Sequence, residues 1–194
     1  MGLNAYLEAV GGVGYTTGTT AAGAWINIDG KPGKRLAIQS VCFNPKLGDA
    51  ATLGYIMPTL KKSSVSSGAS GVTTVTTVAF TSAPATGATV VVVLDNGSYQ
   101  WLTVASTAST TSVPISSALT DDCTSGAIYD LGLYSTAGNY QVAPANAVKT
   151  IEANGSPGIA FGGFKGAPIK VGIIGANASL SATVDYVTYG YINV

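Results

Sequence analysis

The sequence contains no histidine, and charged residues make up only 9% of it. Without an imidazole, no Ser–His–Asp triad can form within one chain, and a serine or cysteine nucleophile lacks its usual general base. The two cysteines are too few for a zinc site built on thiolates. The nine acidic residues show no spacing that indicates the facing carboxylate pair of a glycosidase. We therefore expect a protein without enzymatic activity, metal or cofactor.

Charge of either sign is scarce, with nine Lys and Arg balanced by nine Asp and Glu. An ordinary soluble domain carries roughly 25% charged residues. A surface of hydroxyls and amides repels neighbouring molecules weakly. We therefore expect a protein that is packed in an assembly. The alternative is a monomer with a surface coated by Ser and Thr. No basic stripe indicates nucleic-acid binding. The small groups Lys31, Lys34 and Arg35, and Lys61 with Lys62, are expected to be solvated strand ends.

Long apolar runs and targeting signals are also missing. No stretch approaches the roughly 20 apolar residues of a membrane span, so no membrane partner is expected. Residues 1–5 lack the basic segment and apolar stretch of a secretory signal, which predicts synthesis in a cytoplasm.

Cys42 lies in the apolar run Leu36–Phe43 and is expected to be a buried thiol, whereas Cys123 follows two aspartates in a loop. A disulfide between them is the less favoured alternative.

Thr, Ser, Gly and Val dominate what remains, and they favour strands over helices. Only Leu3–Val10 is expected to form a short helix, ended by two glycines, with one more turn within Ala143–Glu152. Residues 1–24 are expected to form an N-terminal arm. Its Gly- and Thr-rich part, residues 11–24, is equally compatible with a bulged edge or a loop.

Strands are expected from Trp25 onward, at positions where apolar residues alternate or run together. The expected strands are Trp25–Ile28, Leu36–Phe43, Thr52–Met57, Val72–Phe80, Val90–Leu94, Tyr99–Val104, Thr111–Ile115, Leu131–Tyr134, Tyr140–Val142, Ile159–Phe161, Ile169–Ile174 and a long last strand from Leu180. In Val72–Phe80 the even-numbered residues should share one face. Asp95–Ser98 predicts a hairpin with a type I′ turn, because Asn-Gly accepts positive φ angles. Pro114 marks Thr111–Ile115 as an edge strand.

A change of composition divides the chain. Residues 61–71 are rich in Ser and Gly, as in a linker, and a compact β block follows them. The segments on either side need each other, because an isolated hairpin is marginal in water. We therefore predict an all-β protein in which residues 25–62 and 131–194 form a β-sandwich or jelly roll. Residues 63–130 form an inserted β module. The alternative is two sequential domains.

Two pairs of aromatic residues are candidate contact sites. Tyr99 and Trp101 share one face of a strand. Tyr189 and Tyr191 share a face of the last strand with Val187, and Val184 and Tyr186 are expected on its other face. Either pair has the form of a platform on which sugars stack. The favoured interpretation is that both pairs cover a core or a subunit interface.

The middle of the chain resembles a known group of modules. A Thr/Val strand is followed by Ser82–Ala88, Val90–Leu94, Trp101–Val104 and Gly126–Ile128. This order resembles small β modules of tailed-phage virion proteins such as decoration proteins and tail fibres. The flanks look like the β-sandwich or jelly-roll proteins that cement phage capsids, often as trimers.

The resemblance implies a structural protein of the virion, most simply a capsid decoration or cement protein that stabilises the shell. Its partners would be its own copies in a homotrimer and the major capsid protein or another virion protein. The alternative is a tail-fibre or receptor-binding component that contacts host glycans through Tyr99 and Trp101.

Overall fold

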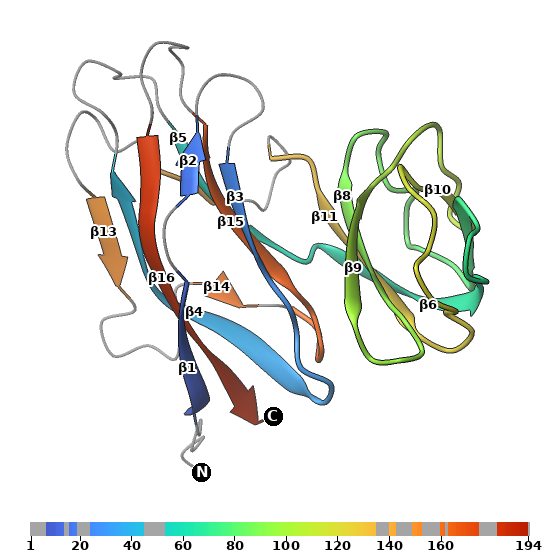
Figure 1. Ribbon diagram of the computed structural model, residues 1–194, viewed down its shortest axis with the longest axis horizontal. Coiled ribbons are helices and arrows are strands. Elements are labelled where there is room, and N and C mark those ends of the chain that lie inside the picture. Colours follow the sequence, from blue (N-terminus) through green and yellow to red (C-terminus); the bar gives the residue numbers. More distant parts are fainter. Residues whose placement is uncertain are drawn as a thin grey trace. The chain divides into compact units, whose positions relative to one another are not determined.

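A computed structural model describes residues 7–13, 16–18, 24–44, 53–134, 140–142, 149–152, 160–161, 163–174 and 182–193. Within these ranges no helix occurs, and every named pair of strands is antiparallel (Figure 1). The expected all-β fold of sandwich or jelly-roll type is confirmed. The chain divides into two compact units: unit 1, Met1–Pro58 with Gly138–Val194, and unit 2, Thr59–Ala137.

Unit 1 is built from two antiparallel sheets. Its strands are β1 (Leu7–Val13), β2 (Thr16–Gly18), β3 (Ala24–Ile28), β4 (Lys34–Asn44), β5 (Leu53–Pro58), β12 (Tyr140–Val142), β13 (Lys149–Glu152), β14 (Ala160–Phe161), β15 (Ile169–Ile174) and β16 (Ala182–Asn193). The first sheet has the order β1-β16-β4-β13, with β2 also on β16 and β14 also on β4. The second has the order β12-β5-β15-β3.

The core of unit 1 consists of the inward side chains of both sheets. They alternate along β3 and β15, as the period of two requires. The buried members are Ile26, Ile28, Leu36, Ile38, Val41, Phe43, Ile56, Ile169, Val171, Ile173, Ala182, Val184 and Val187. Phe43 on β4 meets Gly54 on β5: a Cβ added to Gly54 would lie 2.6 Å from two carbons of the Phe43 ring. Glycine at 54 therefore lets the ring of one sheet pack against the backbone of the other.

Two bulges shift the alternation along the long pair β4–β16. The register passes from Val184↔Phe43 to Tyr186↔Cys42, so Asp185 is an extra residue on β16. Val184 and Val187 consequently both reach the core. The expectation that they lie on opposite faces was wrong because strict alternation does not allow for a bulge. The Asp185 carboxylate accepts hydrogen bonds from the Thr183 hydroxyl at 2.6 Å and the Asn44 amide at 3.2 Å.

Unit 2 contains one six-stranded sheet that curls into a closed barrel. Its strands are β6 (Lys61–Ser67), β7 (Thr74–Thr77), β8 (Thr89–Val93), β9 (Tyr99–Thr103), β10 (Ser112–Pro114) and β11 (Ala127–Gly132), in the order β10-β7-β6-β11-β8-β9. The first and last strands meet through an antiparallel bridge between Val104 and Ile115. The Ser116 amide also donates to the Thr103 carbonyl at 2.9 Å. Closure leaves these sheet edges paired, which removes sites for edge-to-edge aggregation.

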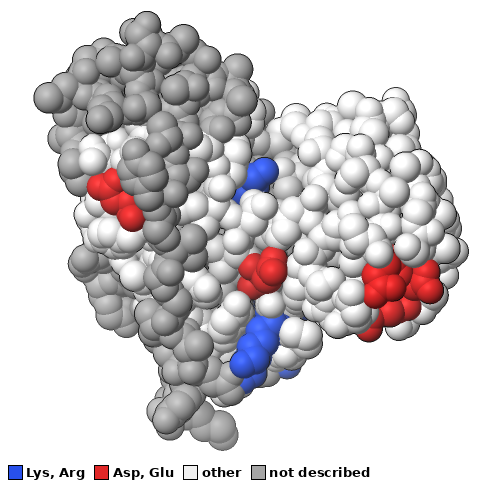
Figure 2. Space-filling view, viewed as in Figure 1, with Lys and Arg blue, Asp and Glu red and all other residues white. Residues whose placement is uncertain are grey.

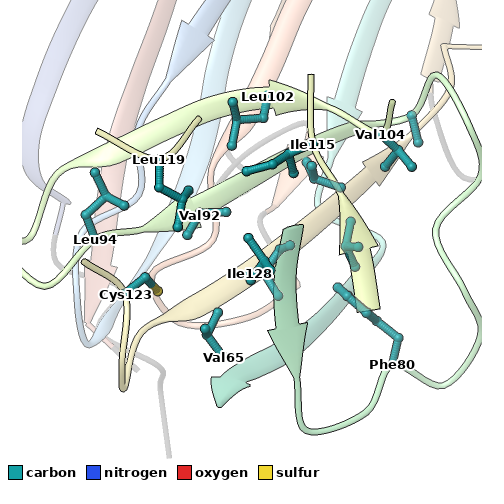
Figure 3. Packing of buried hydrophobic residues seen from close by; sticks show 14 residues of the cluster. Val65, Phe80, Val92, Leu94, Leu102, Val104, Ile115, Leu119, Cys123 and Ile128 are labelled. Carbon is teal, nitrogen blue, oxygen red and sulfur yellow. The ribbon is translucent and has the colours of Figure 1, made fainter. Parts of the chain in front are cut away.

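The interior of this barrel is filled by small and medium apolar side chains that point toward one another (Figure 3). Its buried members are Val65, Val75, Phe80, Ala88, Val90, Val92, Leu94, Leu102, Val104, Val113, Ile115, Leu119, Cys123 and Ile128. Cys123 and Cys42 are both buried free thiols. Since the cluster draws only on unit 2 residues, the barrel has its own hydrophobic core.

The β8–β9 hairpin was predicted correctly, but its turn is of another type. The Gly97 amide donates to the Leu94 carbonyl at 2.9 Å, and the Leu94 amide donates to the Ser98 carbonyl at 2.9 Å. Gly97 has a φ of 85°. This is the three-residue loop in which a type I turn is followed by a left-handed glycine, rather than the two-residue type I′ turn.

Three further local predictions were wrong. The expected helix Leu3–Val10 is strand β1 in its described part, and residues 149–152 of the second expected helical turn form strand β13. The linker-like residues 61–67 form strand β6, in which Ser63 and Val65 are buried. In each case, pairing with a strand far away in the sequence overrides local composition.

Strand β7 alternates as expected, with its even-numbered residues exposed and its odd-numbered residues buried. Val75 and Thr77 are buried, whereas Val78 is 64% exposed. The Thr77 hydroxyl donates to the Thr110 carbonyl at 2.9 Å, which satisfies it inside the barrel. Thr and Val suit either face of a strand, so the pattern of this segment was ambiguous. As predicted, β10 stands at the end of the sheet order, but closure of the barrel pairs its other side, where the Ala105 amide donates to the Pro114 carbonyl at 3.0 Å.

Unit 2 is inserted between two paired strands of unit 1. β5 ends at Pro58, and β12, which pairs with it antiparallel, starts at Tyr140. The strands that enter and leave unit 2, β6 and β11, also pair, with Lys61 opposite Asp130. Unit 2 begins at Thr59, four residues before the module start expected from composition.

Candidate functional site

The predicted pair Tyr189 and Tyr191 lies at one end of β16 on its core-facing side. Both are half-buried and pack against the core of unit 1. Their ring centroids are 6.1 Å apart with an interplanar angle of 87°, an edge-to-face arrangement. The Tyr191 hydroxyl donates to the Asp29 carbonyl at 2.9 Å. Since Asp29 directly follows β3, Tyr191 links the two sheets of the sandwich.

The surroundings of Tyr191 keep its phenol protonated. Burial, followed by the neighbouring Tyr189 and Asp29, raises the pKa of Tyr191 above its ordinary value. A neutral phenol remains a hydrogen-bond donor. The pair therefore serves as packing and as a link between strands.

The other predicted pair belongs to unit 2. Tyr99 and Trp101 lie on the same side of β9, opposite Val93 and Val91 on β8, and both are half-buried. Their neighbour Leu102 points the other way, into the barrel. The structure thus brings each pair together on one strand, and it places the two pairs in different units.

A group of four cationic residues gathers at the end of unit 1 near Tyr191. Lys31 lies in the turn between β3 and β4, Lys34 and Arg35 are the first two residues of β4, and Lys165 lies in the turn before β15. Lys31, Arg35 and Lys165 are exposed, and Lys34 is half-buried. We call these four residues the cationic turn cluster. On the face drawn in Figure 2, the charged side chains of the described residues lie in a few separate areas.

Backbone contacts hold the two turns of this cluster together. The Lys34 amide donates to the Lys31 carbonyl at 3.0 Å, and the Gly166 amide donates to the Lys34 carbonyl at 2.7 Å. A Cβ added to Gly30 would lie 1.9 Å from the Gly166 carbonyl oxygen, so only glycine at 30 permits this approach. The Lys31 ammonium lies 5.9 Å from the centroid of the Tyr191 ring.

Sequence reasoning treated Lys31, Lys34 and Arg35 as solvated strand ends and did not connect Lys165 with them. The two turns are far apart in the sequence, and only the strand pairing of β3 with β15 brings them together. The glycines at 30 and 166 were the available signal, because a glycine in a turn often permits a close backbone approach.

In unit 2, the carboxylates of Asp95 and Asp122 accept hydrogen bonds from backbone amides of other loops. Asp122 accepts from the Ser70 amide at 2.8 Å. Asp95 accepts from the hydroxyl and amide of Thr124, and these bonds lower the pKa of Asp95. Within the described ranges, no group of three or more His, Cys, Asp or Glu side chains is placed to hold a metal ion.

A third aromatic group, which the sequence did not single out, lies on the second sheet of unit 1. The rings of Trp25 on β3 and Tyr55 on β5 are 6.0 Å apart, and the Lys170 ammonium lies 4.8 Å from the Trp25 ring centroid. Burial lowers the pKa of Lys170. A Cβ added to Gly172 would lie 2.2 Å from the Trp25 ring, so the indole packs directly over that glycine.

Comparison with known proteins adds little. No protein-family model and no curated protein matches the chain. A search of solved structures finds a chain from the structure of infectious bursal disease virus, Gt strain, at 14% identity and a TM-score of 0.13. The match covers 96% of this chain and 41% of the viral chain. A similarity this low carries no argument about fold or function. No helix in the described part of the chain is long and apolar enough to cross a membrane.

Proposed function

We propose that the chain is a non-enzymatic structural protein of a virion, and specifically a capsid decoration or cement protein. The supporting observation is the outer face of the β6–β7 pair. Apart from Lys62 near the start of β6, this face exposes hydroxyl-bearing residues, among them Ser64, Ser66, Thr74 and Thr76, while Val65 and Val75 between them fill the core. Burying a hydroxyl against a partner costs much less than burying a charge. Such a surface suits close and lasting packing.

The two-unit architecture supports the same proposal. Unit 2 has its own core and enters unit 1 between paired strands, so one unit can be bound in a lattice while the other keeps its fold. A protein that binds the assembled shell better than the loose one stabilises the shell by mass action. This is the mechanism that we propose.

The decisive experiment is to locate the chain in purified particles. Virions are separated into heads and tails, and the chain is detected by mass spectrometry. Its presence in the head fraction, and a loss of capsid heat resistance when the gene is deleted, would support the proposal. A chain present only outside particles would refute it. Light scattering of the purified protein tests the proposed homotrimer.

The rival function is a tail-fibre or receptor-binding component, favoured by the shared face of Tyr99 and Trp101 on β9. The test is a glycan array probed with the native chain and with Tyr99→Ala/Trp101→Ala. Tyr189→Ala serves as the control in unit 1. Glycan binding lost only in the double variant would favour this rival over decoration.

A further inference from the structure

We infer that the cationic turn cluster of unit 1 binds a carboxylate-rich patch on a partner protein. In locating that partner on the virion shell, this inference rests on the proposed function. The surface is the end of the sandwich where the β3–β4 turn and the turn before β15 meet (Figures 1 and 2).

The first argument is the concentration of charge. Of the nine Lys and Arg in the chain, four lie in these two turns or in the first two residues of β4 beside them. Unit 1 holds seven cations against five acids, while unit 2 holds two cations against four acids. The neutral total therefore conceals a positive unit and a negative one. A surface rich in carboxylates is attracted to this concentration of positive charge.

The second argument is that the cluster is fixed in place. The bond from the Gly166 amide to the Lys34 carbonyl joins the two turns, and the Tyr191 hydroxyl holds Asp29 at their base. Asp29 is also the one acid within the two turns, residues 29–35 and 163–168. A backbone that is already ordered loses little conformational entropy when a partner binds.

The third argument concerns the kind of anion. Nucleic acid is bound through extended basic stripes or grooves in domains of strong positive charge. This cluster is confined to two turns and the first two residues of β4, and it belongs to a chain of net charge +0. These features favour an acidic protein surface.

The binding test uses the full chain and poly-L-glutamate as the probe. The test variant is Lys31→Gln/Lys165→Gln, which removes two exposed cations. The matched control is Lys62→Gln/Lys149→Gln, which removes the same charge from β6 and from β13. Lys149 pairs with Phe43, at the opposite end of β4 from Lys34. We expect the test variant to bind about tenfold more weakly and the control to stay within about twofold of the native chain.

Two results would overturn the inference. One is an equal loss of binding in the test and control variants, because net charge alone would then explain it. The other is tighter binding of the native chain to a single-stranded oligonucleotide of matched charge than to poly-L-glutamate, which would assign the cluster to phosphate. Binding to poly-L-glutamate should also weaken as salt is raised.

A second readout separates this inference from the proposed function. Particles lacking the chain are incubated with the native chain or with either variant and are then sedimented. Native and control chains on the particle, with the test variant left in solution, support both proposals. If all three chains sedimented with the particle, the proposed function would stand, but the cluster would not be what attaches the chain to the particle. None on the particle would refute the function, and the poly-L-glutamate comparison would then decide the inference alone.

Discussion

The contact between Phe43 and Gly54 joins the two sheets of unit 1 at the level of single residues. Gly54→Ala would place a methyl group 2.6 Å from the Phe43 ring, in a core where Phe43 is fully buried. We expect the free energy of unfolding of unit 1 to fall by about 1–3 kcal/mol, because overpacking forces the ring out of its position. Urea unfolding followed by fluorescence measures the change.

A double-mutant cycle shows whether the ring is the cause. Phe43→Leu shortens the side chain that opposes Gly54 and should itself destabilise unit 1 by leaving a cavity. If the clash explains the cost of Gly54→Ala, the double variant should be more stable than the sum of the single effects implies. Strictly additive costs would show that the ring and the glycine are not coupled.

Tyr191 gives a second prediction at this scale, through its hydrogen bond to Asp29. Tyr191→Phe should cost about 0.5–1.5 kcal/mol at neutral pH, because it removes that bond. The pKa of Tyr191 is raised in the folded state, so its stabilising effect is complete below the ordinary value of 10.0 and is lost as the pH rises through the folded pKa.

The stability difference between the native chain and Tyr191→Phe should therefore narrow above about pH 10. Thermal unfolding between about pH 8 and pH 11 measures this difference. The paired comparison matters because Lys170, whose pKa is lowered, acts in the opposite direction: it adds stability as the pH rises toward 10.5. A difference that stays constant with pH would contradict the assignment to the Tyr191 phenol.

At the scale of elements, strand β16 organises the first sheet of unit 1. It pairs with β4 along most of its length, and β1 and β2 pair with its other side. The described part of the expected N-terminal arm is therefore built into the sheet. Deleting residues 1–23 removes two strands and leaves β16 as an open edge, which favours aggregation.

We expect this deletion to lower the unfolding temperature of unit 1 and to leave that of unit 2 unchanged. Each unit contains one tryptophan, Trp25 in unit 1 and Trp101 in unit 2. Trp101→Phe and Trp25→Phe versions of the deletion therefore report on the two units separately. An unchanged transition of unit 1 would favour the original expectation that these residues form an arm outside the fold.

The expected strands that follow apolar runs or clear turn signals lie where they were predicted, as Val90–Leu94 and the hairpin after it show. Strand β6 was missed because serines make its sequence look like a linker, and because one of its two partners, β11, lies far along the chain. The faces of β16 were misassigned because a bulge adds one residue at Asp185. An isolated acid inside a strand was the only local sign of it.

The candidate sites, like the strands, were predictable only where they depend on residues close together in the sequence. Tyr99 with Trp101 and Tyr189 with Tyr191 were each expected on one strand face, since residues two apart on a strand point the same way. The cationic turn cluster could not be predicted, because Lys165 joins Lys31 only after β15 has paired with β3. Features set by residues close together in the sequence could be predicted, whereas features set by the order in which strands pair could not.

At the scale of the whole molecule, the chain path predicts that the two units fold independently. Unit 2 lies between β5 and β12, which pair with each other, and its own first and last strands pair beside the Lys61–Asp130 ion pair, with the ammonium 3.5 Å from the carboxylate. Residues 59–137 can therefore be excised without separating any paired strands of either unit.

Two chains test this prediction: residues 59–137 alone, and unit 1 with those residues replaced by an Asn-Gly turn between Pro58 and Gly138. Each should unfold cooperatively, because each retains a complete hydrophobic core. For a barrel of this size we expect a free energy of unfolding of about 4–12 kcal/mol. Calorimetry of both pieces and of the full chain supplies the comparison.

Limited proteolysis of the full chain should release unit 2 intact while the two segments of unit 1 stay associated. If residues 59–137 were unfolded when isolated, or if the joined unit 1 lost its transition, the two cores would have to be interdependent, and attachment through one unit could not leave the other unchanged.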